Sequence, residues 1–175
     1  PLASISEELA QITVTCIAPS KTFNLAGLYT SAVIIPNPRL LGHFKNVAAS
    51  LGAEGSNVFG MVALEAAYRY GEPWLDQLLV YLQGNLEFLT SYLAAHIPQI
   101  RVIRPEGMYL AWLDCREASI TGKPCDFFMR EARVALNDGT TFGRGGEDFV
   151  RLNFACPRAT LTQALGQMKA ALGKL

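Results

Sequence analysis

Residues 18–28 read Ala-Pro-Ser-Lys-Thr-Phe-Asn-Leu-Ala-Gly-Leu, and this polar stretch decides the fold because of what lies on either side of it. The run that leads into it, Ile12–Ala18, and the run that follows, Thr30–Ile35, are short, apolar and rich in β-branched residues. Such runs are typical of strands that are buried on both faces. Two of them around a polar loop predict the middle of a sheet in an α/β domain.

Helical patterns follow this pair of strands, and a compact β/α unit closes the chain. The spacing of apolar residues predicts helices over Arg39–Ser50, Ser56–Tyr70 and Trp74–His96. Beyond Pro98 the patterns predict strands over Ile100–Arg104, Met108–Asp114, Thr140–Phe142 and Phe149–Phe154, and helices over Pro124–Ala135 and Ala159–Leu172. We expect two domains, 1–97 and 98–175, with the boundary near residue 98 or inside the long helix before it.

Composition is that of a globular protein, because 50% of the residues are hydrophobic and only 17% are charged. The 15 basic and 15 acidic side chains cancel, so charge favours neither a nucleic-acid nor a membrane partner, and no apolar run is long enough to span a bilayer. Four scattered cysteines without a CxxC pair, and only two histidines, predict no metal site and favour free thiols in the cytoplasm. The start at Pro1 reads as the middle of a longer protein.

Lys21 is the first candidate for chemistry, since it follows a predicted buried strand on the polar loop. Open α/β sheets place ligand sites beyond the carboxyl ends of their strands. A lysine there that is neutral part of the time can form a Schiff base with a carbonyl compound. The alternative is an ordinary exposed loop lysine, and position alone does not exclude it.

Arg151 is the second candidate, because it interrupts the apolar strand Phe149–Phe154. Alternation places Val150 and Leu152 on one face of that strand and Arg151 on the other. A bidentate guanidinium suits a carboxylate, although an internal ion pair with an acidic residue explains the position equally well. The nearby Gly143-Arg144-Gly145-Gly146 lacks the ending of a phosphate-binding P-loop and predicts a turn with positive-φ glycines.

The stretch at 18–28 resembles the cofactor-lysine segment of fold-type I pyridoxal 5'-phosphate (PLP) enzymes, the class I/II aminotransferases, and above all the MalY/PatB subfamily of cystathionine β-lyases. Three further stretches resemble later segments of that family in the same order: 34–38 (IIPNP), 105–114 (PEGMYLAWLD) and 149–158 (FVRLNFACPR). The resemblance implies the C-terminal part of the PLP-transferase large domain, an α/β domain with a mixed, mostly parallel sheet, followed by the small α+β C-terminal domain.

The resemblance also implies chemistry. Lys21 would hold PLP as a covalent aldimine and move the Cα proton, Ser20 would bind the cofactor phosphate, and Arg151 would bind the substrate carboxylate. The implied activity is a C–S β-lyase acting on cystathionine or another S-substituted cysteine, in a chain that forms a homodimer at full length. An aminotransferase is the alternative within the family, and a non-catalytic binding module is the alternative from another class.

Two departures from the family pattern concern the cofactor. Many aminotransferases carry a hydroxyl three residues before the lysine and an arginine eight residues after it, where this chain has Ala18 and Tyr29. We take the missing arginine to favour the lyase branch. The aspartate that pairs with the pyridine nitrogen lies upstream of the lysine in this family, so we expect the 175-residue chain not to be a competent enzyme by itself.

Overall fold

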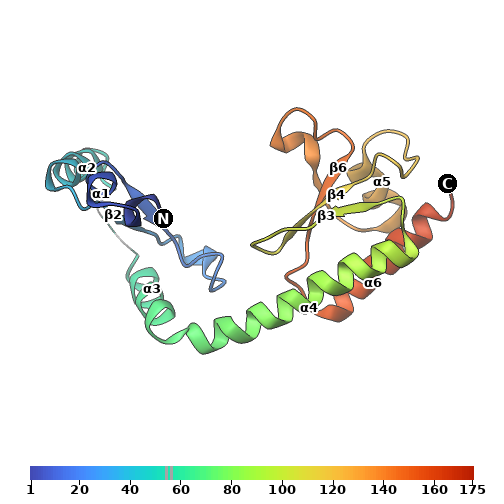
Figure 1. Cartoon of the computed structure of the whole chain (residues 1–175), viewed down its shortest axis with the longest axis horizontal. Coiled ribbons are helices and arrows are strands. Elements are labelled where there is room, and N and C mark those ends of the chain that lie inside the picture. Colours follow the sequence, from blue (N-terminus) through green and yellow to red (C-terminus); the bar gives the residue numbers. More distant parts are fainter. Residues whose placement is uncertain (54, 56) are drawn as a thin grey trace. The chain divides into compact units, whose positions relative to one another are not determined.

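The computed structural model describes residues 1–53, 55 and 57–175 (Figure 1). The chain divides into two compact units, Pro1–Gln77 and Leu78–Leu175, with the division inside one long helix. The predicted domains 1–97 and 98–175 stay a prediction, and the alternative of a boundary inside the long helix agrees with this division. Within the described residues, no helix is both long enough and apolar enough to cross a membrane.

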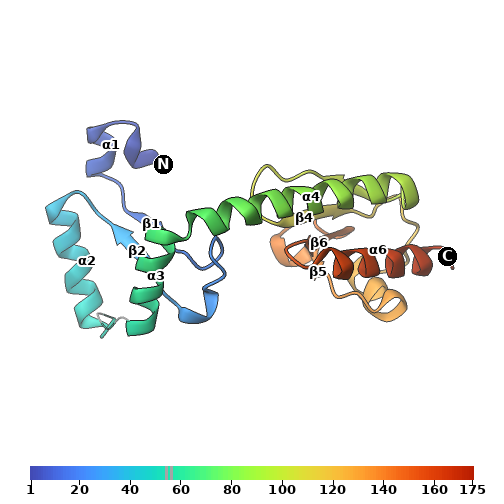
Figure 2. The ribbon, with the colours of Figure 1, turned by 90° about the horizontal axis from the view of Figure 1, so that it is seen from below.

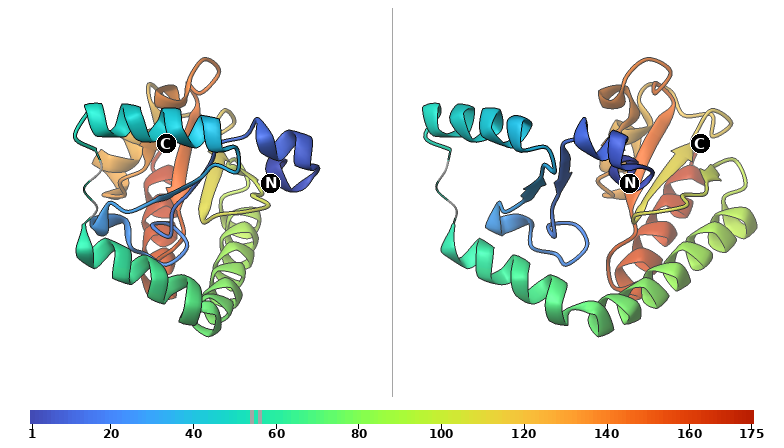
Figure 3. Two further views of the ribbon diagram at one scale, coloured as in Figure 1. Left: turned by 90° about the vertical axis from the view of Figure 1, so that its left-hand side faces the viewer. Right: turned by 60° about the vertical axis from the view of Figure 1, so that its left-hand side comes forward.

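The first unit contains a short antiparallel ribbon (Figure 3). Strand β1 (Thr15–Ile17) pairs with β2 (Ala32–Ile34), with Thr15 opposite Ile34. A parallel pair needs a crossover, usually a helix, whereas this connection holds only the 3₁₀ turn η2 (Ala26–Leu28). The expected mostly parallel sheet is therefore not what these two strands form.

Both strands are also less buried than predicted. Ile34 is 49% exposed and Ile17 is 37% exposed. The expectation of strands buried on both faces is wrong for this chain, because a two-stranded ribbon has no neighbouring strands, and the elements packed around it leave part of both faces uncovered.

The first unit also contains helices, the last of which continues into the second unit. Ser6 caps the short α1 (Glu7–Gln11) by accepting from the Leu9 N–H, and Asn37 caps α2 (Pro38–Ser50) by accepting from two N–H groups. Helix α3 (Val58–Tyr70) follows, while the predicted helix start at Ser56 lies outside the described residues. The helix break predicted around Gly71 separates α3 from α4 (Glu72–His96).

The second unit is a four-stranded antiparallel sheet of order β3-β4-β6-β5, covered on one face by α4 and α6 (Figures 1 and 2). Residues 101–103 and 110–114 pair as expected for the two strands around residues 105–107, with Trp112 opposite Ile103. Residues 110–114 also pair with 149–153, with Trp112 opposite Arg151, a pairing that the sequence did not predict. The strands and remaining helices are β3 (Arg101–Ile103), β4 (Leu110–Asp114), β5 (Asn137–Asp138), β6 (Phe149–Asn153), α5 (Pro124–Phe127) with a π-helical turn over Phe128–Ala132, and α6 (Arg158–Leu172).

One predicted strand is wrong. Residues 140–142 lie in the 3₁₀ turn η4 (Gly139–Phe142), and β5 precedes it. The Asp138 carboxylate accepts from the Thr140 N–H at 2.9 Å, and the Thr141 hydroxyl donates to the Asp138 carbonyl at 2.7 Å. Local side-chain bonds of this kind offer the backbone an alternative to the ladder.

The core of the second unit lies between the sheet and its two helices. Leu89 and Leu93 on α4, Val150 on β6, and Leu165 on α6 are all at most 1% exposed. Asn85, also fully buried, donates from Nδ2 to the carbonyls of Phe154 and Cys156, both at 2.9 Å. This side chain ties α4 to the segment that leads from the sheet into α6.

Candidate functional site

Lys21 lies in a tight turn directly after β1, as the sequence predicted. Its side chain is exposed and, with the hydroxyl-bearing Ser20, Thr30 and Ser31, lines an open pocket of about 520 Å³. With the Tyr29 phenol the pocket holds an amine and four hydroxyl groups, a set that can bind a carbonyl compound that also carries a phosphate. No acidic residue lines this pocket among the residues that the structure describes.

Tyr29 and Ala18 stand where the family resemblance leads us to expect an arginine and a hydroxyl. Tyr29 closes the 3₁₀ turn η2 in a left-handed conformation, with φ of 47°, and its side chain is 94% exposed. It lines the same pocket as Lys21. Its phenol supplies a hydroxyl to the pocket lining where an arginine would supply a permanent charge.

Arg151 lies on the face of the sheet opposite the core. Val150 and Leu152, its neighbours along β6, are at most 3% exposed, so the predicted alternation is confirmed. The register aligns Ile103, Trp112, Arg151 and Asn137 in one row across the four strands. The row presents one cationic side chain among an indole, an aliphatic group and an amide.

Contacts within the second unit orient the Arg151 guanidinium. One Nη donates to Asn137 Oδ1 at 3.1 Å, and the guanidinium carbon lies 4.5 Å from the centre of the Phe142 ring. The Nε atom is buried and has no hydrogen-bond partner. In the described part of the chain no acidic side chain forms an ion pair with Arg151, so the alternative of an internal salt bridge is not what the structure contains.

Aromatic rings surround this arginine. Phe142 meets Trp112 edge to face at 5.3 Å, and Trp112 stacks on Phe149 at 5.7 Å. This cluster could not be predicted from the sequence, because Phe142 contacts Arg151 from a turn whose sequence pattern is that of a strand. The glycine turn that follows is confirmed, with φ of 121° at Gly143 and 87° at Gly145.

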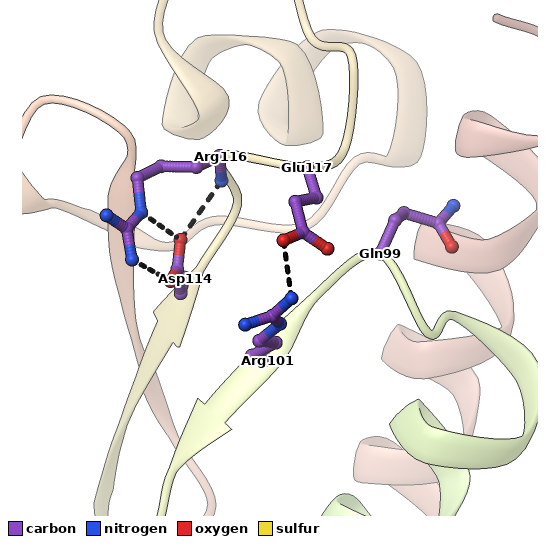
Figure 4. Close-up of a pocket in the computed structure, with 5 residues that line it drawn as sticks. All are labelled: Gln99, Arg101, Asp114, Arg116 and Glu117. Carbon is purple, nitrogen blue, oxygen red and sulfur yellow. Dashed lines mark hydrogen bonds and ion pairs between the residues drawn. The ribbon is translucent and has the colours of Figure 1, made fainter.

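A second, smaller pocket of about 260 Å³ lies at the edge of the same sheet (Figure 4). Arg116 donates to both oxygens of Asp114, at 2.9 and 2.7 Å, and Arg101 pairs with Glu117. The hydrogen bond from Arg116 lowers the pKa of Asp114 below its ordinary value. The charges cancel in pairs, so this pocket offers a ligand no free charge and has a structural role.

The described residues contain no cluster of three His, Cys, Asp or Glu side chains that could hold a metal ion. The four cysteines are free thiols, as expected. Burial raises the pKa of the Cys115 thiol to about 12, so this group stays protonated and unreactive at neutral pH.

Comparison with known proteins agrees with the family resemblance that the sequence motifs indicated. The chain is 42% identical over 173 residues to cystathionine beta-lyase PatB of Bacillus subtilis (strain 168), covering 98% of this chain and 45% of that protein. It is 34% identical over 157 residues to protein MalY of Escherichia coli (strain K12), covering 87% and 40%. The crystal structure of cystalysin from Treponema denticola, which contains pyridoxal 5'-phosphate, matches with a TM-score of 0.91 at 32% identity, covering 98% and 44%.

These matches confirm the resemblance along nearly the whole chain, together with the fold class, as the C-terminal part of a PLP-transferase fold. No protein-family model matches the chain. The chain spans less than half the length of the relatives that it matches, 45% for PatB and 40% for MalY.

Proposed function

We propose, because the chain corresponds to the C-terminal portion of the PLP-dependent PatB and MalY proteins, that the polypeptide carrying it is a C–S β-lyase acting on cystathionine or another S-substituted cysteine. The observation that carries the proposal is the pocket that groups the exposed amine of Lys21 with four hydroxyl-bearing side chains, directly after β1.

The residues of this pocket fit two parts of PLP. The Lys21 amine can react with the aldehyde, and the hydroxyls of Ser20 and Ser31 can donate hydrogen bonds to the phosphate, whereas the Thr30 hydroxyl donates to the Leu28 carbonyl at 3.0 Å. When bound, PLP withdraws electrons from the substrate's Cα. The task of Lys21 is then to take the proton from Cα, which makes it the general base of the reaction.

Arg151 is proposed as the group that binds the substrate carboxylate. A cation with a buried, partner-free Nε and no ion pair within the described chain has donor capacity left for an anion. Asn137 and the Phe142 ring hold the guanidinium plane, so less side-chain freedom is lost when a carboxylate binds. A fixed carboxylate in turn fixes which bond at Cα is aligned for cleavage.

We also propose the cellular compartment and the oligomeric state of the enzyme. Free cysteines agree with a reducing cytoplasm, and the family resemblance supports a homodimer at full length. The isolated 175-residue chain is expected to be inactive, because it spans only 45% of PatB and its Lys21 pocket has no acidic lining residue that could hold the pyridine nitrogen protonated.

The test uses the polypeptide at its natural length with PLP and L-cystathionine. A lyase releases a thiol and, with uptake of water, pyruvate and ammonia, without any second substrate. An aminotransferase forms a new amino acid only when a 2-oxo acid is added, and a binding module does neither. Lys21→Ala is expected to abolish product formation, while Lys45→Arg, on α2, is the matched control. Turnover that survives Lys21→Ala would refute the proposal.

A further inference from the structure

The turn that carries Lys21 is fixed on both sides of the lysine. Pro19 is fully buried, and its carbonyl accepts from the Phe23 N–H at 2.8 Å. The Leu25 N–H donates to the Ser20 carbonyl at 3.0 Å, and Asn24 turns the chain with φ of 55°. Lys21 is exposed inside this frame, so its backbone is held while its side chain is free.

An aromatic ring attaches this frame to the helices of the first unit. Phe23 meets the Tyr68 ring edge to face at 5.7 Å, and it stacks on the Trp74 ring at 6.2 Å with 30° between the planes. Tyr68 lies near the end of α3 and Trp74 near the start of α4, so one side chain contacts both helices. Aromatic pairs in these geometries stabilise beyond the area that they bury.

Gly71 makes room for the ring. A Cβ atom at this position would lie 2.6 Å from Cε1 of Phe23 and 2.4 Å from the Ala67 carbonyl oxygen. No other residue fits there unless the ring or the helix end shifts. The glycine that separates α3 from α4 therefore also leaves the space that the Phe23 ring occupies.

We propose that Phe23, seated on Tyr68, Gly71 and Trp74, is a positioning residue that holds the Lys21 turn at its pocket. The inference rests on the proposed role of Lys21 and adds what keeps that lysine in place. Without the ring, the turn keeps its two backbone hydrogen bonds but loses its attachment to α3 and α4. Two aromatic pairs correspond to about a tenfold change in the equilibrium constant between the held and the released turn.

The experiment labels the full 175-residue chain with pyridoxal 5'-phosphate. A lysine amine condenses with the aldehyde and loses water, and borohydride then adds hydride to make the bond permanent. Peptide mapping gives the ratio of label on Lys21 to label on Lys45. The variants are Phe23→Leu, which removes the ring, Phe23→Tyr, which keeps it, and Phe59→Leu, the control at a side chain that is 78% exposed.

A second readout needs no cofactor: the rate of trypsin cleavage after Lys21 relative to cleavage after Lys45. Phe23→Leu is expected to raise the cleavage ratio, which follows the small released fraction of the turn, about tenfold and to lower the label ratio, whereas Phe23→Tyr and Phe59→Leu leave both ratios as in the wild type. If Phe23→Leu does not fold by circular dichroism, Trp74→Leu removes the stacked partner and takes its place.

The outcomes separate the inference from the function on which it rests. A wild-type chain that prefers Lys21 and a Phe23→Leu variant that prefers it equally overturn the positioning role. A wild-type chain without preference for Lys21 shows that these 175 residues alone do not direct pyridoxal 5'-phosphate to this lysine, and the label then says nothing about Phe23. The trypsin ratio then decides alone: faster cleavage in Phe23→Leu upholds the positioning of the turn, and unchanged cleavage overturns it.

Discussion

Replacing Asn85 with alanine is expected to destabilise the second unit far more than any change at the surface of the same helix. Asn85 is fully buried, donates from Nδ2 to the carbonyls of Phe154 and Cys156, and accepts from Arg158 Nε at 2.8 Å. The backbone N–H of Arg158 also reaches α4, through the Tyr81 hydroxyl at 2.7 Å. The start of α6 is thus held by polar contacts with α4.

The magnitude follows from what each partner loses. The buried Phe154 carbonyl is left without the bond that Asn85 supplied, at about 1–3 kcal/mol, and the half-buried Cys156 carbonyl and the more accessible Arg158 side chain lose bonds at about 0.5–1 kcal/mol each. The sum is about 3 kcal/mol, a large share of the 5–15 kcal/mol that is typical of a domain. Asn85→Asp is expected to be at least as harmful, since a carboxylate cannot donate to either carbonyl.

Urea unfolding followed by the fluorescence of Trp112, in a Trp74→Phe background, measures this unit alone, because Trp112 packs against Phe142 and Phe149. With a denaturant slope of about 1.5 kcal/mol per molar, the midpoint for Asn85→Ala falls by about 2 M. The control is Gln83→Ala, an exposed amide on the same helix, with a loss below about 0.5 kcal/mol. Equal midpoints for Asn85→Ala and Gln83→Ala would refute the reasoning.

Four further predictions concern the core, the backbone, the thiols and pH. Leu89→Ala, at 0% exposure, is expected to cost about 2–5 kcal/mol by the same urea assay, and Leu79→Ala, at 55% exposure, less than about 0.5 kcal/mol. Gly71→Ala is expected to lower the melting temperature because its Cβ meets the Phe23 ring. Gly42→Ala, inside α2, is expected to raise it because a Cβ there meets nothing within 4 Å, and equal shifts of the two melting temperatures would contradict this. Iodoacetamide is expected to modify the exposed Cys16 first and the buried Cys115, with its pKa raised to about 12, last, and early labelling of Cys115 by mass spectrometry would count against the structure. Hydrogen bonding from Lys123 lowers the pKa of Asp138 from 3.8 to about 2, so this ion pair stabilises the folded chain above about pH 4 and loses its effect as the pH falls toward 2. The stability difference between wild type and Asp138→Asn should shrink over that range and stay constant above it, up to the alkaline range in which Lys123 loses its proton.

The helices of this chain could be predicted because their apolar residues repeat at the helical period. The predicted helix over Trp74–His96 lacks only the first two residues of α4, and the one over Ala159–Leu172 differs from α6 by one residue. The side of β6 on which Arg151 lies followed from simple alternation. These helices and the orientation of Arg151 follow from the local sequence pattern, and the tertiary packing agrees with it.

What sequence reasoning missed depends on contacts between distant residues. The partners of Asn85 lie 69 and 71 positions away, so nothing near Asn85 distinguishes it from an exposed helix residue. An apolar run such as Ile12–Ala18 predicts burial, yet Ile12 is 71% exposed, because burial depends on which elements pack against the run. Residues 140–142 read as a strand because the turn is set by side-chain bonds of Asp138.

The two proposed site residues are held in different ways, and the difference suits what each would do. Arg151 has its guanidinium itself fixed, by a hydrogen bond to Asn137 and by the Phe142 ring, as an anchor for a planar carboxylate requires. At Lys21 only the backbone is fixed, through the Phe23 ring and the carbonyls of Pro19 and Ser20, and the exposed amine stays free to turn. A group that must carry a proton to and from one carbon needs that freedom, whereas a group that only orients the substrate does not.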